Sequence, residues 1–200
     1  MHSKAGTRAC PVNAKSIVRV AVALAAAALT VATVAPARAG ELQLAAAAGG
    51  EGSSWRGDGA GFVGIKLGYR FLDLVAPYFI GRLGYANTNQ RVIEMLQLGV
   101  QLWARLGIAR PYLRLGVIHQ HEEPWASVEA DGWGALLGVG DGIRHRAGFE
   151  GALGVDVPFF QRKAWQVYAT VEGFATGFPD SKGPVVYGGG TLGLGLDFAL

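Results

Sequence analysis

The 200-residue chain is half hydrophobic, has only 16% charged residues and contains 31 glycines. Its length is typical of a single domain. After residue 40 no stretch reaches the roughly eighteen uninterrupted apolar residues of a helical membrane span, which excludes such a span there. The apolar residues are therefore expected on strands.

The first 39 residues have the pattern of a helical secretory signal peptide. Four basic residues come first, an uncharged apolar run over 20–34 follows, and Ala37-Arg38-Ala39 provides the small residues of a cleavage site. We predict a cleaved signal peptide over 1–39 and a mature domain over 40–200. A retained helical anchor is the alternative.

Removal of this segment changes the charge and the cysteine content. It holds five of the 18 Lys and Arg residues and none of the 15 acids, so 13 basic residues would face 15 acidic ones, a net charge of −2. The basic footprint of a nucleic-acid-binding protein is then absent, and no nucleic-acid partner is expected. The single cysteine, Cys10, would be removed too, which excludes a disulfide framework.

Eight segments after residue 40 alternate apolar and polar residues with a period of two, the pattern of strands with one apolar face. They are 41–48, 61–70, 73–85, 91–105, 111–121, 145–157, 164–174 and 185–198. In the second, Val63, Ile65 and Leu67 alternate with Gly64, Lys66 and Gly68. For 41–48 a short helix is the alternative, because its run of alanines shows little alternation between apolar and polar residues.

The links between these segments sort by length. Segments 71–72, 106–110 and 158–163 are short, while three of the four links at the other end are long. Outer-membrane barrels have short periplasmic turns and longer outer loops. We therefore predict an all-β fold: an eight-stranded antiparallel up-and-down transmembrane β-barrel, with apolar side chains toward lipid and polar ones toward the lumen. A soluble periplasmic barrel is the alternative.

With this pattern the chain resembles the small eight-stranded outer-membrane β-barrels of the OmpA/OmpX type. The last strand, over 187–200 with Phe198 as its aromatic residue, is similar to the signal read by the barrel assembly machinery, although two residues follow the aromatic one. The resemblance implies the outer membrane of a Gram-negative bacterium, contact with its lipid and lipopolysaccharide, and insertion by that machinery. We also expect a monomer without a cofactor.

The inward charges are divided between two arcs of the expected barrel. Basic residues lie on the second to fifth strands and acidic ones on the sixth to eighth. The set is Lys66, Arg70, Arg82, Arg105, Arg114, Glu150, Asp156, Glu172 and Asp197. Eight strands leave an interior that side chains can fill. We predict cross-lumen ion pairs that block conduction; a narrow ion-conducting pore is the alternative.

Aromatic and basic residues mark the two ends of the expected barrel. Outward rings near the short turns predict a periplasmic aromatic girdle of Tyr69, Phe71, Trp165 and Phe198. Tyr85 and Phe149 are the best candidates for an outer girdle. Near the outer end, Arg91, Arg144 and Arg146 are predicted to contact lipopolysaccharide phosphate, which arginine binds with two hydrogen bonds.

The longest link, 122–144, carries further candidates. It is flanked by His119, His121 and His145, which together with the adjacent Glu122 and Glu123 could bind Zn²⁺. The alternative is that these are solvated polar residues at the rim of the barrel. Ser127 has Glu129 and histidines near it in sequence, which is weak evidence for a lipid A deacylase. The glycine-rich stretch 138–142 is interpreted as a loop, and the tripeptide Arg56-Gly57-Asp58 as a chance match to an integrin-binding motif.

From these features we predict a non-enzymatic outer-membrane protein with a structural or surface-interaction role. Its outer loops would contact lipopolysaccharide or another partner. A lipid A-modifying barrel enzyme and a narrow pore remain the alternatives.

Overall fold

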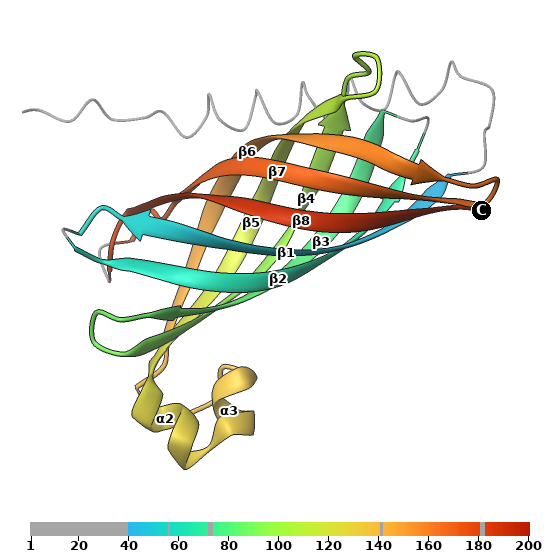
Figure 1. Cartoon of the computed structure of the whole chain (residues 1–200). Coiled ribbons are helices and arrows are strands. Elements are labelled where there is room, and N and C mark those ends of the chain that lie inside the picture. The colour runs from blue at the N-terminus through green and yellow to red at the C-terminus, as the bar shows by residue number, and fades with distance from the viewer. Residues whose placement is uncertain (1–39, 56, 72–73, 141, 181–182) are drawn as a thin grey trace, which may run out of the picture. The chain divides into compact units, whose positions relative to one another are not determined.

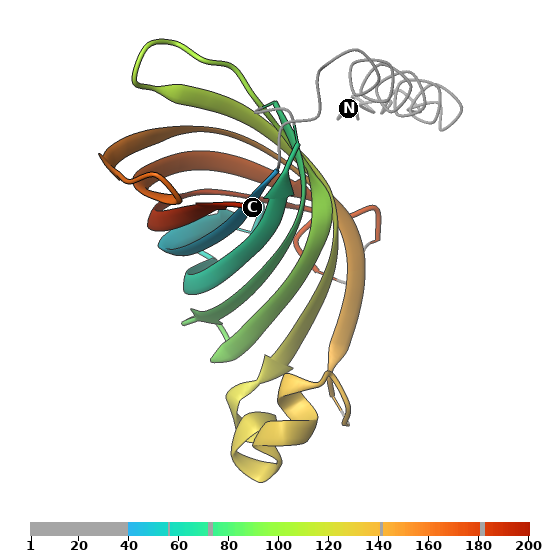
Figure 2. The ribbon, with the colours of Figure 1, turned by 90° about the vertical axis from the view of Figure 1, so that its right-hand side faces the viewer.

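The computed structural model describes residues 40–200 except 56, 72–73, 141 and 181–182. The signal peptide predicted over 1–39 lies outside the described residues. Within the described part of the chain, no helix is long and apolar enough to cross a membrane. Eight antiparallel strands pair in chain order, and β1 pairs with β8 to close the barrel (Figures 1 and 2). The predicted all-β barrel is confirmed.

The eight strands are joined by seven connections, of which the one between β5 and β6 holds two short helices. The strands are β1 (Glu41–Ser53), β2 (Gly59–Arg70), β3 (Val75–Ala86), β4 (Arg91–Trp103), β5 (Arg110–Pro124), β6 (Arg144–Gln161), β7 (Trp165–Gly177) and β8 (Val186–Ala199). The helices are α2 (Trp125–Ala130) and α3 (Gly132–Leu136). The short helix considered for 41–48 is wrong, because these residues form strand hydrogen bonds with β2 and β8.

The strands turn their apolar side chains outward and their polar side chains inward, as the alternation predicts. The outward residues Leu67, Leu98, Val117 and Leu194 are 49%, 60%, 53% and 59% exposed. Their inward neighbours Gln97, Arg114 and Asp197 are each 1% exposed. A continuous belt of exposed apolar side chains around a polar interior is the arrangement of a barrel that faces lipid.

Inward glycines allow large rings to lie against neighbouring strands. A Cβ atom built at Gly195 of β8 would lie 2.0 Å from the Cζ atom of Tyr168 on β7. A Cβ atom at Gly154 of β6 would lie 2.3 Å from the Cζ atom of Tyr112 on β5. Each tyrosine ring therefore occupies the space that a side chain on the next strand would need.

The β5–β6 hairpin extends farther than the sequence pattern indicates. β5 continues to Pro124 and β6 begins at Arg144, so Glu122 and Glu123 belong to a strand rather than a loop. Residues 125–136 then form α2 and α3 at the end of the barrel opposite the C-terminus (Figure 1). Two glutamates that sequence reasoning assigns to a loop thus take positions on the barrel wall.

Candidate functional site

Four charged residues form a cluster in the middle of the lumen: Arg82, Arg114, Glu150 and Glu172. Arg82 on β3 donates two hydrogen bonds to the carboxylate of Glu150 on β6, at 2.7 and 2.9 Å. Arg114 on β5 reaches both acids, with Nη2 2.9 Å from Oε1 of Glu150 and Nε 2.8 Å from Oε2 of Glu172. The structure thus brings together four residues of the predicted lumen set.

Neutral groups complete the hydrogen bonding of this cluster. Thr176 donates to Glu150 at 2.8 Å, Tyr112 donates to Glu172 at 3.1 Å, and Gln97 accepts from Arg114. The guanidinium of Arg82 also lies over the rings of Phe62 and Phe174, with Cζ–centroid distances of 5.3 and 4.6 Å. Buried charges are tolerated when they are paired and hydrogen-bonded in this way.

A second group of charges lies at the short-turn end of the lumen and centres on Asp197. Its carboxylate accepts hydrogen bonds from Arg70 at 3.3 Å, Arg110 at 3.2 Å and Gln43 at 3.0 Å. Arg70 also pairs with Glu41. Sequence reasoning missed Arg110, because it assigns residues 106–110 to a turn, whereas β5 already begins at this residue.

The remaining lumen predictions have mixed outcomes. Lys66 donates to Gln101 at 3.1 Å, and Asp156 accepts from the indole of Trp103 at 3.0 Å. No ion pair involving either residue is found in the described part of the chain. The predicted position of Arg105 on a strand is wrong: β4 ends at Trp103, and Arg105 is exposed in the turn beyond it. Its ion pair stays a prediction. The inward alternation does not extend past the strand.

The side chains leave little space around the central cluster. A cavity of about 50 Å³ lies beside it, lined among others by Lys66, Tyr112 and Glu172. Toward the short turns an open pocket of about 410 Å³ is bordered by Arg70, Arg105 and Asp197. The smaller volume holds only a few water molecules.

Glu122 joins three arginines at the outer mouth of the lumen. It pairs with Arg91 at 2.7 Å, with Arg146 at 3.4 Å and with Arg144. Tyr187 and Gln120 also donate hydrogen bonds to it, at 3.1 and 2.8 Å. Nothing in the local sequence distinguishes Glu122 from a loop glutamate, so its role depends on the extension of β5.

Two of the three arginines, Arg91 and Arg146, do not lie where the lipopolysaccharide prediction requires them. Arg91 and Arg146 are 7% and 1% exposed, and they face the lumen mouth rather than the outer leaflet. Arg91 also binds Asp58 at 2.5 Å, and Arg146 binds Asp180 at 3.0 Å. Carboxylates already occupy their guanidinium groups, so the prediction is corrected for these two residues.

Aromatic side chains gather at the short-turn end, where the girdle is predicted. Tyr69 and Phe71 make an edge-to-face contact with centroids 4.6 Å apart, and Trp165 stacks on Phe160 at 5.1 Å. Phe71, Trp165 and Phe198 are exposed. Sequence reasoning missed Phe159 and Phe160, because it assigns 158–163 to a turn, whereas β6 continues to residue 161 with an irregular register.

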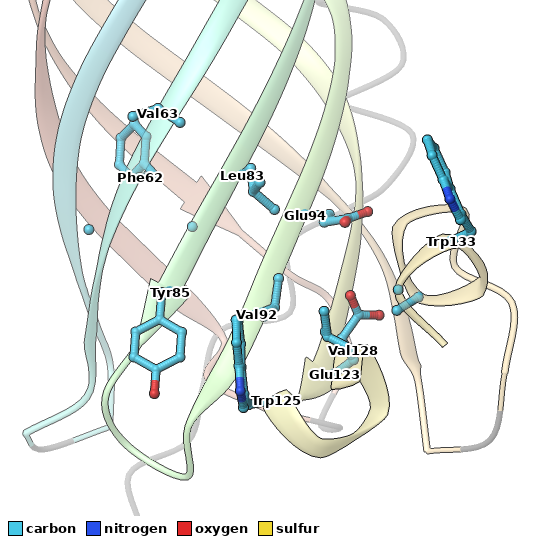
Figure 3. A pocket seen from close by; sticks show the side chains of 14 residues that line it. Phe62, Val63, Leu83, Tyr85, Val92, Glu94, Glu123, Trp125, Val128 and Trp133 are labelled. Atoms are coloured by element: carbon cyan, nitrogen blue, oxygen red, sulfur yellow. The ribbon is translucent and has the colours of Figure 1, made fainter. Parts of the chain in front are cut away.

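At the outer end, Tyr85 makes an edge-to-face contact with Trp125, with ring centroids 6.0 Å apart. Phe149, the other outer candidate, pairs with Val117 and lies in the apolar belt. Trp125 and Trp133 of the two helices are both exposed. Between these helices and the outer wall of β2–β4 lies an apolar pocket of about 740 Å³ (Figure 3).

The three candidate metal ligands His119, His121 and His145 converge on the outer wall of the barrel, not in the lumen. Their ligand nitrogens all lie within 4.8 Å of one another. No hydrogen bond joins the Ser127 hydroxyl to a histidine in the described part of the chain. Asp58, in the integrin-like tripeptide, is buried against Arg91, while Arg56 lies outside the described residues.

No protein-family model and no curated protein sequence matches the chain. Among solved structures, Neisserial surface protein A is similar with 16% identity and a TM-score of 0.55, over 83% of this chain and all of its own. OprG from Pseudomonas aeruginosa has 14% identity and a TM-score of 0.48, over 82% of this chain and 98% of its own. By its fold, the chain is therefore a closed eight-stranded antiparallel β-barrel of the kind found in small outer-membrane proteins.

Proposed function

We propose that the protein is a non-conducting outer-membrane barrel of a Gram-negative bacterium with a structural or surface-interaction role. The observation that carries this proposal is the buried cluster of Arg82, Arg114, Glu150 and Glu172. An ion crossing the lumen would have to separate these pairs. Separating a buried ion pair leaves charges without partners in the protein interior, which is strongly unfavourable.

Two further layers of paired charge support closure. Glu122 and its arginines lie at the outer mouth, and Asp197 lies with Arg70 and Arg110 at the short-turn end. Each carboxylate is held by at least two guanidinium groups. A mobile ion would therefore meet three successive paired layers rather than one.

The surface-interaction role rests on the outer segment. α2 and α3 carry two exposed indole rings, Trp125 and Trp133, and aromatic residues are enriched at protein interfaces. For lipopolysaccharide, we propose contact through Arg144, whose side chain is 26% exposed, rather than through the buried Arg91 and Arg146.

Conductance in planar lipid bilayers tests the proposal. We expect no conductance from the protein, and brief openings from the double variant Arg82→Ala with Arg114→Ala, because both cations that hold the central carboxylates are then gone and only the two end layers remain. The variant Arg162→Ala, which removes an exposed arginine beyond the end of β6, is the matched control and stays closed. A steady conductance of porin size from the unaltered protein would establish the pore alternative instead.

Cell fractionation tests the location separately. We expect the protein in the detergent-extracted outer membrane, with an electrophoretic mobility that changes on boiling. Recovery in the aqueous periplasmic fraction would contradict the membrane assignment, whatever the conductance.

A further inference from the structure

Three histidines meet on the outer wall, near the outer end of the β5–β6 hairpin. His119 and His121 are two residues apart on β5 and point to the same face, and His145 of β6 pairs directly with His121. Nδ1 of His145 lies 3.5 Å from Nε2 of His119. The three rings pack around one point, with centroid separations of 4.6, 4.6 and 5.6 Å.

Two carboxylates accompany the histidines on the same wall. Glu94 of β4 pairs with His121, and its Oε2 lies 4.0 Å from Nδ1 of that ring. Glu123 follows His121 by two residues on the same face and is 1% exposed. Both of its carboxylate oxygens lack a hydrogen-bond partner in the described part of the chain. Figure 3 shows both carboxylates on the wall that faces α2 and α3.

A buried carboxylate without partners is costly, and nearby cations normally offset that cost. Here the described neighbours on the same wall are imidazoles and a second carboxylate, not arginine or lysine. Like charges on Glu94 and Glu123 add repulsion. The arrangement is therefore deficient in positive charge, unlike the central lumen cluster, where Glu150 and Glu172 each contact arginine.

We propose that His119, His121 and His145 bind one divalent transition-metal ion, with Zn²⁺ as the best match, on the outer wall of the barrel. Around tetrahedral Zn²⁺ the nitrogens lie at about 2.0–2.1 Å from the metal, hence about 3.4 Å from one another. The 3.5 Å between His119 and His145 already has this value, and small ring rotations bring in His121. Glu94 is placed to hold His121, as carboxylates commonly orient metal-binding imidazoles.

The site also joins the barrel wall to the segment that carries α2 and α3. Gly138, which follows α3 and has φ +68°, lies directly over His121: a Cβ atom there would be 2.1 Å from Cε1 of the ring. Metal binding fixes the orientation of that ring. It thereby holds the backbone of residues 137–139 against the wall and orders the outer segment.

The small number of histidines makes the test sharp. The chain has four, and the fourth, His2, lies in the segment predicted to be cleaved. In protein purified without a histidine tag, imidazole ligation of an added metal therefore reports on this cluster.

Calorimetric titration of the detergent-extracted, tag-free protein with Zn²⁺ decides the proposal. We expect saturable binding of one ion per chain, weakened at least tenfold in His119→Asn and His145→Asn and unchanged in Glu129→Gln, which alters an exposed carboxylate of α2. Heat-modifiable gel migration verifies that each variant is a folded barrel. Absence of saturable binding, or equal binding by the folded histidine variants, overturns the proposal.

Limited proteolysis supplies a second readout that does not depend on affinity alone. Zn²⁺ is expected to slow cleavage within residues 125–143 of the unaltered protein at least threefold, and not in His145→Asn. Glu129→Gln, an exposed carboxylate change in α2, keeps the response to Zn²⁺. A response retained by folded His145→Asn would show that the metal acts elsewhere and would overturn the site.

Discussion

Arg82 on β3 and Glu150 on β6 meet face to face in the lumen, with Nη1 to Oε2 at 2.7 Å and Nη2 to Oε1 at 2.9 Å. The two strands are not neighbours, so this two-point contact ties together opposite parts of the barrel wall. Two parallel hydrogen bonds between a guanidinium and a carboxylate add directionality to the attraction of the charges. The pair thus links opposite parts of the barrel wall across the lumen.

Replacing Arg82 with methionine is expected to reduce the free energy of unfolding by about 3 kcal/mol, the lower end of the range for breaking a buried pair. Glu150 keeps Arg114, which limits the loss. Urea unfolding in phospholipid vesicles, followed by tryptophan fluorescence, measures the change. Arg162→Met, an exposed arginine, serves as the control and should remain within about 0.5 kcal/mol of the unaltered protein.

Glu122→Gln is expected to be at least as damaging, with a loss of about 3 kcal/mol or more. The substitution removes the charge that faces Arg91, Arg144 and Arg146, two of which are buried. Hydrogen exchange should increase at the outer ends of β5 and β6. Glu129→Gln makes the same chemical change on an exposed helix. Equal effects of the two substitutions would contradict the role of Glu122 as the shared partner of the three arginines.

The two faces of the barrel could be predicted from sequence because lipid and lumen impose opposite requirements on alternate residues. Val63, Ile65 and Leu67 alternate with Gly64 and Lys66 over the length of β2, and only one register satisfies both faces. Closure of the sheet follows from the need to satisfy every backbone group in lipid, because it pairs the two edge strands β1 and β8. Local pattern was therefore sufficient for the architecture.

The pairing of charges could not be predicted in the same way. Whether Arg91 meets Glu122 or lipid phosphate depends on where β5 ends and on how the β4–β5 register places the two side chains. Strand ends carry weak signals, because the alternation fades where the chain leaves the membrane. Arg105 illustrates the error in the other direction: alternation extrapolated two residues past Trp103 assigns it to the lumen.

Gly195→Ala is expected to destabilise the barrel by about 1–3 kcal/mol, the usual range for overpacking. Its Cβ atom would overlap the ring of Tyr168, which is fully buried and has no free space to move into. The urea midpoint of the folded protein in vesicles measures the effect. Gly188→Ala lies on the same strand with its nearest atom at 3.8 Å, and should leave the midpoint almost unchanged.

A leucine on the outer belt tests the orientation of the whole barrel in the membrane. Leu98 is 60% exposed and belongs to the apolar belt, so arginine there would face hydrocarbon. Leu98→Arg is expected to cost about 2–4 kcal/mol in phospholipid vesicles, the range for a charged residue near the bilayer midplane. The same free energy measured in detergent micelles should change less, because water reaches the micelle surface more easily.

Leu137→Arg is the matched control for that substitution, since Leu137 is 69% exposed and lies outside the strands. Its expected change is within about 0.5 kcal/mol in both environments. If Leu98→Arg were equally mild in vesicles, the outer belt would be in contact with water rather than lipid. The exposed leucines would then need a protein partner to cover them, and a transmembrane position of the barrel would be ruled out.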